Sequence, residues 1–162
     1  MENWKKLNSI EYDSVWDKFE EKYQFRPSVS EFPGITNKFP QLKFDIEKCY
    51  DDIFKNEKKI ENIALDLFKK ITKPNERMYA LDWQHESYDF DPRFIIDKDE
   101  ILDEWIIPIF PNGDYYIFLT KDFKKLWFGH PWEQTITLVG EEIIKYSDNL
   151  IADFEKLDIK LF

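Results

Sequence analysis

The chain has little of what several protein classes require. It has a single cysteine, Cys49, so no intramolecular disulfide can form, and this predicts a reducing compartment. Its 4 glycines are too few for a glycine-rich phosphate loop or a many-bladed β architecture. No apolar run approaches the length of a membrane helix, and none follows the first residues as a signal peptide would. These absences predict a cytoplasmic protein without a membrane partner.

Basic residues are outnumbered as well. The chain has 23 Lys and Arg against 33 Asp and Glu, which gives a formal net charge of −10 at pH 7. Nucleic-acid binding depends on clustered basic side chains, whereas here they are scattered among acidic ones, so we expect no nucleic-acid partner. An acidic surface favours solubility alone, or pairing with a basic protein.

Aromatic residues, in contrast, are abundant. They form 18% of the chain, with 15 Phe, 8 Tyr and 6 Trp. Large rings bury much area per residue, which predicts a core rich in rings. The length of 162 residues fits one domain over residues 1–162.

Three segments have a helical period of apolar residues. Residues 8–23 begin at Asn8, which can cap a helix with Glu11 as its capping-box partner. Residues 46–71 form a longer amphipathic segment that Pro74 terminates. Residues 141–157 predict a closing helix, which the polar residues 147–149 can divide in two. Between the first two helices, prolines interrupt residues 25–44, and we interpret this segment as a packed connector.

The second half of the chain predicts strands. The strongest pattern is a hairpin, with strands at 105–110 and 115–120 joined by the turn Pro111-Asn112-Gly113-Asp114. Further strands are expected at 78–83, 125–129 and 134–139, with mostly loop at 84–98. The predicted fold class is α+β: an antiparallel sheet of four or five strands, with N-terminal helices and a C-terminal helix packed on one face.

The only two histidines, His85 and His130, lie in two strings of polar and aromatic residues, at 82–86 and 130–134. On an extended strand, Asp82, Gln84 and Glu86 would share one face, and Trp83 and His85 the other. Together with the end of the turn, the two strings predict one pocket or interaction site. Its candidate residues are Asp82, Trp83, Gln84, His85, Glu86, Asp114, Tyr115, His130, Trp132, Glu133 and Gln134.

Three interpretations of these strings stay open. His85 and His130 with two carboxylates could hold zinc or another divalent ion, but no HExxH motif or cysteine pair supports this, so we expect no metal and no cofactor. A histidine oriented by Asp82, Glu86, Asp114 or Glu133 could act as a general acid or base.

The third interpretation is structural, with His130 bonding backbone at a turn before Pro131. No nucleophile is evident, because Cys49 lies on an apolar helical stripe and no G-x-S-x-G motif occurs. Catalytic residues are therefore unassigned, and the sequence leans against an enzyme.

Several strings resemble an uncharacterised bacterial family of proteins of unknown function, number 2716. They are the opening Ser-Val-Trp-Asp-Lys-Phe at 14–19, then residues 79–85, 110–119 and 129–134. Asn112 stands where the family's turn is expected to have Asp, a change that preserves turn chemistry. The resemblance implies a soluble bacterial protein and no assigned activity, so it carries over no catalytic residues.

The chain is also similar in style to small acidic immunity proteins of bacterial toxin systems. The similarity lies in composition and in the run Ile-Pro-x-Phe, Gly-Asp, Tyr-Ile-Phe-Leu between residues 107 and 119. It implies a protein-binding module that masks a basic toxin. The alternative is a small enzyme or ligand-binding protein whose pocket combines residues 82–86 and 130–134.

Overall fold

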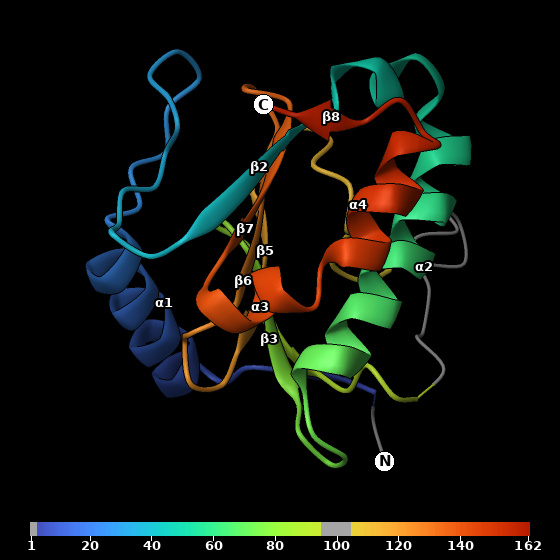
Figure 1. Ribbon diagram of the computed structural model, residues 1–162. Helices are drawn as coiled ribbons and strands as arrows, with labels where there is room; N and C mark the ends of the chain where they lie inside the picture. The colour runs from blue at the N-terminus through green and yellow to red at the C-terminus, as the bar shows by residue number, and fades with distance from the viewer. Residues whose placement is uncertain (1–2, 95–104) are drawn as a thin grey trace.

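The computed structural model describes residues 3–94 and 105–162, which form one antiparallel sheet with helices on both faces (Figure 1). Every neighbouring pair of strands is antiparallel. In spatial order the eight strands of the described residues are β1 (Trp4–Lys6), β4 (Tyr88–Phe90), β3 (Met78–Asp82), β5 (Tyr116–Thr120), β6 (Leu126–His130), β7 (Thr135–Val139), β2 (Gln41–Asp45) and β8 (Lys160–Leu161).

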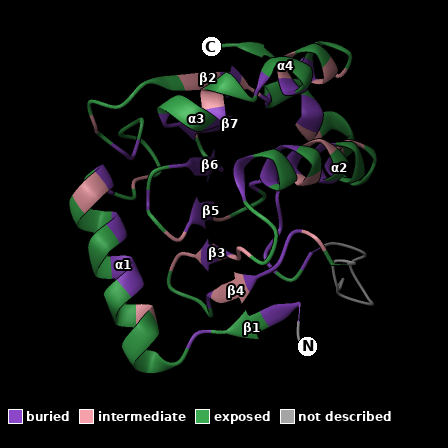
Figure 2. Cartoon of the chain, turned by 60° about the horizontal axis from the view of Figure 1, so that its bottom comes forward, coloured by how far each residue is buried: buried purple, intermediate pink, exposed green. Residues whose placement is uncertain are grey.

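Helices cover both faces of this sheet, not one face as predicted (Figures 1 and 2). Helix α1 (Ser9–Tyr23) and residues 25–35 cover one face. The other face carries a short 3₁₀ helix (Glu47–Asp52) and the helices α2 (Ile53–Ile71), α3 (Glu141–Lys145) and α4 (Asp148–Glu155). The physical reason is that β6 and β7 are buried along their whole length, so apolar side chains on both faces need cover.

The two cores follow from the alternation of side chains along the central strands. On β5, Phe118 points to the α2 side, where its ring centroid lies 5.4 Å from that of Phe68. Its neighbours Ile117 and Leu119 point to the α1 side. Both cores are rich in rings, as the composition predicts.

The helix ends agree well with the sequence. The side chain of Asn8 accepts the backbone N–H of Glu11, and the Glu11 side chain accepts the N–H of Asn8, so the predicted capping box is confirmed. Helix α2 ends at Ile71, before Pro74, and the Arg93 guanidinium donates to its last carbonyls, including that of Lys69 at 3.0 Å. The predicted closing helix is divided into α3 and α4.

The predicted hairpin does not form. Strand β5 pairs with β3 and β6, and residues 106–110 lie outside the sheet as an irregular segment on the α2 side, exposed at Ile106 and buried from Ile107 to Phe110. Pro108 offers one physical reason, because it lacks the N–H that a strand would donate. Gly113 (φ +89°) still makes the expected turn before β5.

The sheet is wider than predicted, with eight strands and not four or five. The strands expected at 78–83, 125–129 and 134–139 are confirmed as β3, β6 and β7. Four unpredicted strands account for the excess: β1 and β8 lie at the two edges, β2 begins inside the predicted connector, and β4 lies inside the predicted loop. The end of that loop, residues 95–98, lies outside the described residues. Among the described helices, none has the length and apolar character to cross a membrane.

Candidate functional site

A tight turn at the end of β3 brings Asp82 and His85 together. The strand stops at Asp82, and the chain reverses through Gln84, whose φ of +66° is left-handed. The N–H of His85 donates to the carbonyl of Asp82 at 3.1 Å, which closes the turn. The alternation expected for an extended strand therefore ends here. His85 Nδ1 lies 3.2 Å from Asp82 Oδ1 and 3.0 Å from the carbonyl oxygen of Trp83.

Asp114 reaches the same histidine from the loop before β5. Strand pairing places Tyr116 opposite Asp82, so the residues just before β5 lie beside the β3 turn. Asp114 Oδ1 accepts the backbone N–H of Tyr115 at 2.8 Å, while Oδ2 lies 3.1 Å from His85 Nδ1. Within the described residues, Asp82, His85 and Asp114 are the only group of three side chains whose ligand atoms could share one metal ion.

The groups of this cluster shift the pKa values of Asp82 and His85. Burial and the neighbouring Asp114 raise the pKa of Asp82 to about 7. The negative charge of Asp82 raises the pKa of His85 in turn, with a smaller contribution from Asp114. Asp82 and Asp114 expose 17% and 15% of their side chains, whereas His85 exposes 65%, so the histidine covers the carboxylates from the solvent side.

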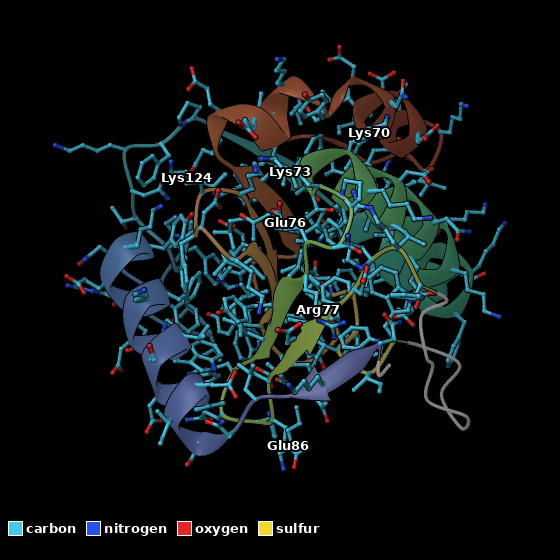
Figure 3. The ribbon with its side chains drawn as sticks, turned by 90° about the horizontal axis from the view of Figure 1, so that it is seen from below. Lys70, Lys73, Glu76, Arg77, Glu86 and Lys124 are labelled. Atoms are coloured by element: carbon cyan, nitrogen blue, oxygen red, sulfur yellow. The ribbon has the colours of Figure 1, made fainter. Side chains whose placement is uncertain are left out.

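An open groove of about 1080 Å³ runs beside this cluster. Asp82, Gln84, His85 and Glu86 line one side of the groove, and Asn8, Tyr12 and Asp13 at the start of α1 line another. Glu86 lies at the outer rim, where it forms an ion pair with Lys6 on β1 at 2.7 Å (Figure 3). Asp82 and part of its turn thus face a space large enough for a ligand.

His130 has very different surroundings. It is fully buried at the end of β6, and its Nδ1 accepts the backbone N–H groups of Trp132 at 3.3 Å and Glu133 at 3.0 Å. Burial lowers its pKa to about 4, so the ring is neutral at pH 7. Its Nε2 has no hydrogen-bond partner in the described part of the chain and lies among the rings of Phe32 and Tyr115.

The neighbours of His130 also make contacts that hold the backbone. Glu133 forms an ion pair with Lys43 of β2 at 3.0 Å and accepts the hydroxyl of Thr135 at 2.7 Å. Gln134 adopts a left-handed φ of +60°, and its carbonyl accepts the N–H of Ile46. These contacts agree with the structural interpretation of this string.

Tyr115 lies between the two strings. Its ring centroid is 5.8 Å from that of Trp83, 4.8 Å from that of His130 and 5.2 Å from that of Trp132. Both strings therefore pack around one tyrosine, although the groove takes its lining from residues 82–88 and not from 130–134. The structure joins Asp82, His85 and Asp114 into one cluster and places His130 outside it.

Comparisons with known proteins confirm the resemblance to family 2716. Residues 6–144 match the family described as "Protein of unknown function (DUF2716)". The uncharacterized protein YxiI of Bacillus subtilis (strain 168) is 36% identical over 155 residues, which cover 92% of this chain and 94% of that protein. The chain belongs to the DUF2716 family. No solved structure matches it.

Three of the four strings that carry the family resemblance lie around the turn after β3 and the ring of Tyr115. The string at 79–85 gives β3 and its turn, the string at 110–119 gives Asp114, Tyr115 and most of β5, and the string at 129–134 gives the turn that packs on Tyr115. The opening string at 14–19 lies on α1.

The sequence analysis did not identify Ser87, which connects α1, the end of β3 and the segment before α1 by hydrogen bonds. Its hydroxyl accepts the indole N–H of Trp16 at 3.2 Å and the N–H of Asp82 at 3.3 Å, and its carbonyl accepts the N–H of Leu7. A serine in a polar turn gives no signal of such burial, because its partners come from α1 and β3.

Proposed function

We propose that this DUF2716 protein is a binding module for a basic protein, of the kind represented by immunity proteins that mask a toxin. The observation that carries the proposal is an acidic, solvent-facing α1. This helix has five acidic and two basic residues, whereas α2 on the opposite face has three acidic and five basic residues. Helix α1 thus carries a net charge of −3 and α2 one of +2, although α3 and α4 beside α2 add five acidic residues and one basic residue. We take α1 as the surface that would attract a basic partner.

The acidic side chains of α1 are available for such a partner. Asp13, Asp17, Glu20 and Glu21 are exposed and make no ion pair within the described residues. Figure 2 shows α1 with its outer face exposed on one side of the sheet, away from α2, α3 and α4. Unneutralised carboxylates on a rigid helix steer association at low ionic strength.

Exposed apolar residues in the connector after α1 supply anchors for such a partner. The connector that follows the helix exposes 64% of Val29, 44% of Phe32 and 45% of Phe39. The Phe39 ring centroid lies 6.2 Å from that of Tyr23, the last residue of α1. Aromatic anchors bordered by charge are typical of protein interfaces. We call the outer face of α1 together with Val29, Phe32 and Phe39 the α1 surface.

The test is capture of a partner at low salt, followed by mass spectrometry. We expect one stoichiometric basic protein, encoded near this chain's gene if it is a toxin, whose retention falls as salt rises. A variant that neutralises the α1 surface should lose it. That variant carries Asp13→Asn, Asp17→Asn, Glu20→Gln and Glu21→Gln.

A matched control changes the charge by the same amount on the other face of the sheet. It carries Asp66→Asn, Asp148→Asn, Asp153→Asn and Glu155→Gln on α2 and α4. Equal loss of the partner from both variants would reject the α1 surface. Recovery of no stoichiometric partner, with no toxin gene nearby, would reject the proposed function.

A further inference from the structure

We propose that Asp82, His85 and Asp114, with the carbonyl oxygen of Trp83, form a binding site for one divalent transition-metal ion, with Zn²⁺ as the best fit. The site goes beyond the proposed function, because none of its donors belongs to the α1 surface. It replaces the expectation of no metal, which concerned a pair of His85 and His130, with a donor set that omits His130. We call these four donors the Asp82–His85–Asp114 site.

The donor atoms have the spacing of ligands around an ion. His85 Nδ1 lies 3.2 Å from Asp82 Oδ1, 3.1 Å from Asp114 Oδ2 and 3.0 Å from the Trp83 carbonyl oxygen. A tetrahedral ion that holds each ligand at about 2.0–2.2 Å sets adjacent ligands roughly 3.3–3.6 Å apart, slightly wider than the spacing here. The ligand atoms of the three side chains all lie within 4.8 Å of one another, which is compatible with their sharing one ion.

Protons satisfy this arrangement only in part, although a proton on Asp82 can form a hydrogen bond to Asp114. Three oxygens surround one imidazole nitrogen, which carries at most one hydrogen and can direct it well at one of them. A cation in place of that hydrogen would contact all three oxygens and the nitrogen together. Its two positive charges would match the charges of the two carboxylates.

The surrounding contacts hold the donors in place. Asp114 Oδ1 accepts the N–H of Tyr115, which leaves Oδ2 directed toward His85. The backbone of Asp82 is fixed by its strand pairing with Tyr116 and by a hydrogen bond from its N–H to Ser87 Oγ. Such supporting contacts orient metal ligands and are a regular part of metal sites.

The site is open on one side. His85 exposes 65% of its side chain, and the groove of about 1080 Å³ runs along Asp82 and His85. An ion can enter from this side, and water or a small ligand can complete its coordination. The donor set of one imidazole and three oxygens selects against Mg²⁺ and Ca²⁺, which prefer oxygen ligands alone.

The experiment is calorimetric titration of the chelator-treated full chain with Zn²⁺, and with Mg²⁺ for comparison. We expect one Zn²⁺ per chain and no comparable Mg²⁺ binding. His85→Gln and Asp114→Asn should each weaken Zn²⁺ binding at least about tenfold. Glu86→Gln is the matched control, because it neutralises a carboxylate in the same turn that pairs with Lys6. It should change the affinity by no more than about twofold.

Circular dichroism of the metal-free variants separates loss of the site from loss of the fold. The visible absorption of Co²⁺ in the parent should report coordination by nitrogen and oxygen, and His85→Gln should abolish that spectrum. The proposal is overturned by the absence of one-to-one Zn²⁺ binding. It is equally overturned if folded Asp114→Asn keeps the parent affinity, or if Glu86→Gln loses as much affinity as Asp114→Asn.

Discussion

The hydroxyl of Tyr115 makes two hydrogen bonds to the backbone of Ser28. It accepts the N–H of Ser28 at 3.0 Å and donates to the carbonyl of Ser28 at 3.1 Å. The pair joins the loop before β5 to the connector after α1. The connector has no strand partner at Ser28, and the Tyr115 hydroxyl satisfies both of its backbone polar groups instead.

Tyr115→Phe should therefore destabilise the protein by about 2 kcal/mol, because it leaves two backbone groups of Ser28 without their partner. Urea denaturation followed by tryptophan fluorescence measures the change. Tyr88→Phe serves as the control, because its hydroxyl donates to the exposed Glu86 and its loss should cost less. Equal stability of the Tyr115 variant and the parent would contradict the prediction.

The buried His130 should make stability depend on pH. Burial lowers its pKa from 6.5 to about 4, with Glu133 opposing and Lys43 assisting the shift. The unfolded chain therefore takes up a proton near pH 6.5, whereas the folded chain does so only near pH 4. The contribution of neutral His130 is complete above pH 6.5. It declines as pH falls toward 4, by up to about 3 kcal/mol.

The measurement compares the parent with His130→Asn. The raised pKa of Asp82 acts in the opposite direction, so the stability of the parent alone does not isolate His130. The difference in free energy of unfolding between parent and variant should shrink as pH falls from 6.5 to 4. A difference that stays constant over this interval would show that His130 does not titrate as described.

The single cysteine should be inert in the folded protein. Burial raises the pKa of Cys49 to about 11, and the residue is 1% exposed. At pH 8 only about one thiol in a thousand would be ionised, so thiolate chemistry is suppressed. Ellman's reagent should react slowly with the native protein and rapidly in guanidinium chloride. Similar rates in the two states would contradict this prediction.

Gly140 should tolerate no side chain. Its φ is +121°, and a Cβ there would lie 2.2 Å from the carbonyl oxygen of Lys124. Gly140→Ala should cost more than about 3 kcal/mol, because it adds a backbone clash to conformational strain. Gly113→Ala is the control, since its φ is +89° but no atom lies within 4 Å of the new Cβ. It should cost about 1 kcal/mol in thermal or urea unfolding.

Local signals in the sequence predict local structure well. The capping box of Asn8 and Glu11, the end of α2 before Pro74 and the division between α3 and α4 all depend on neighbouring residues. The position of β2 does not. It follows Pro40 with a weak alternation of buried residues, and only its pairing with β7 makes it a strand.

In the candidate site, too, the sequence indicates the individual residues but not the long-range pairing that brings them together. Asp82, His85 and Asp114 stand out in the sequence as polar groups among aromatic residues, but their meeting depends on the pairing of β3 with β5. His130 stands out for the same reason, yet it lies beyond β5 at the end of β6. Periodicity along one chain cannot distinguish a histidine in a groove from one in the core.

The position of β2 between β7 and β8 also affects how the chain folds. Gln41 pairs with Val139, and Phe44 packs against Phe154. The contacts of β2 therefore form only when the last third of the chain is present. Closing so long a loop costs entropy before any contact repays it, and such topologies fold slowly. During synthesis, we expect the apolar residues of β2 to be covered only after β7 has left the ribosome.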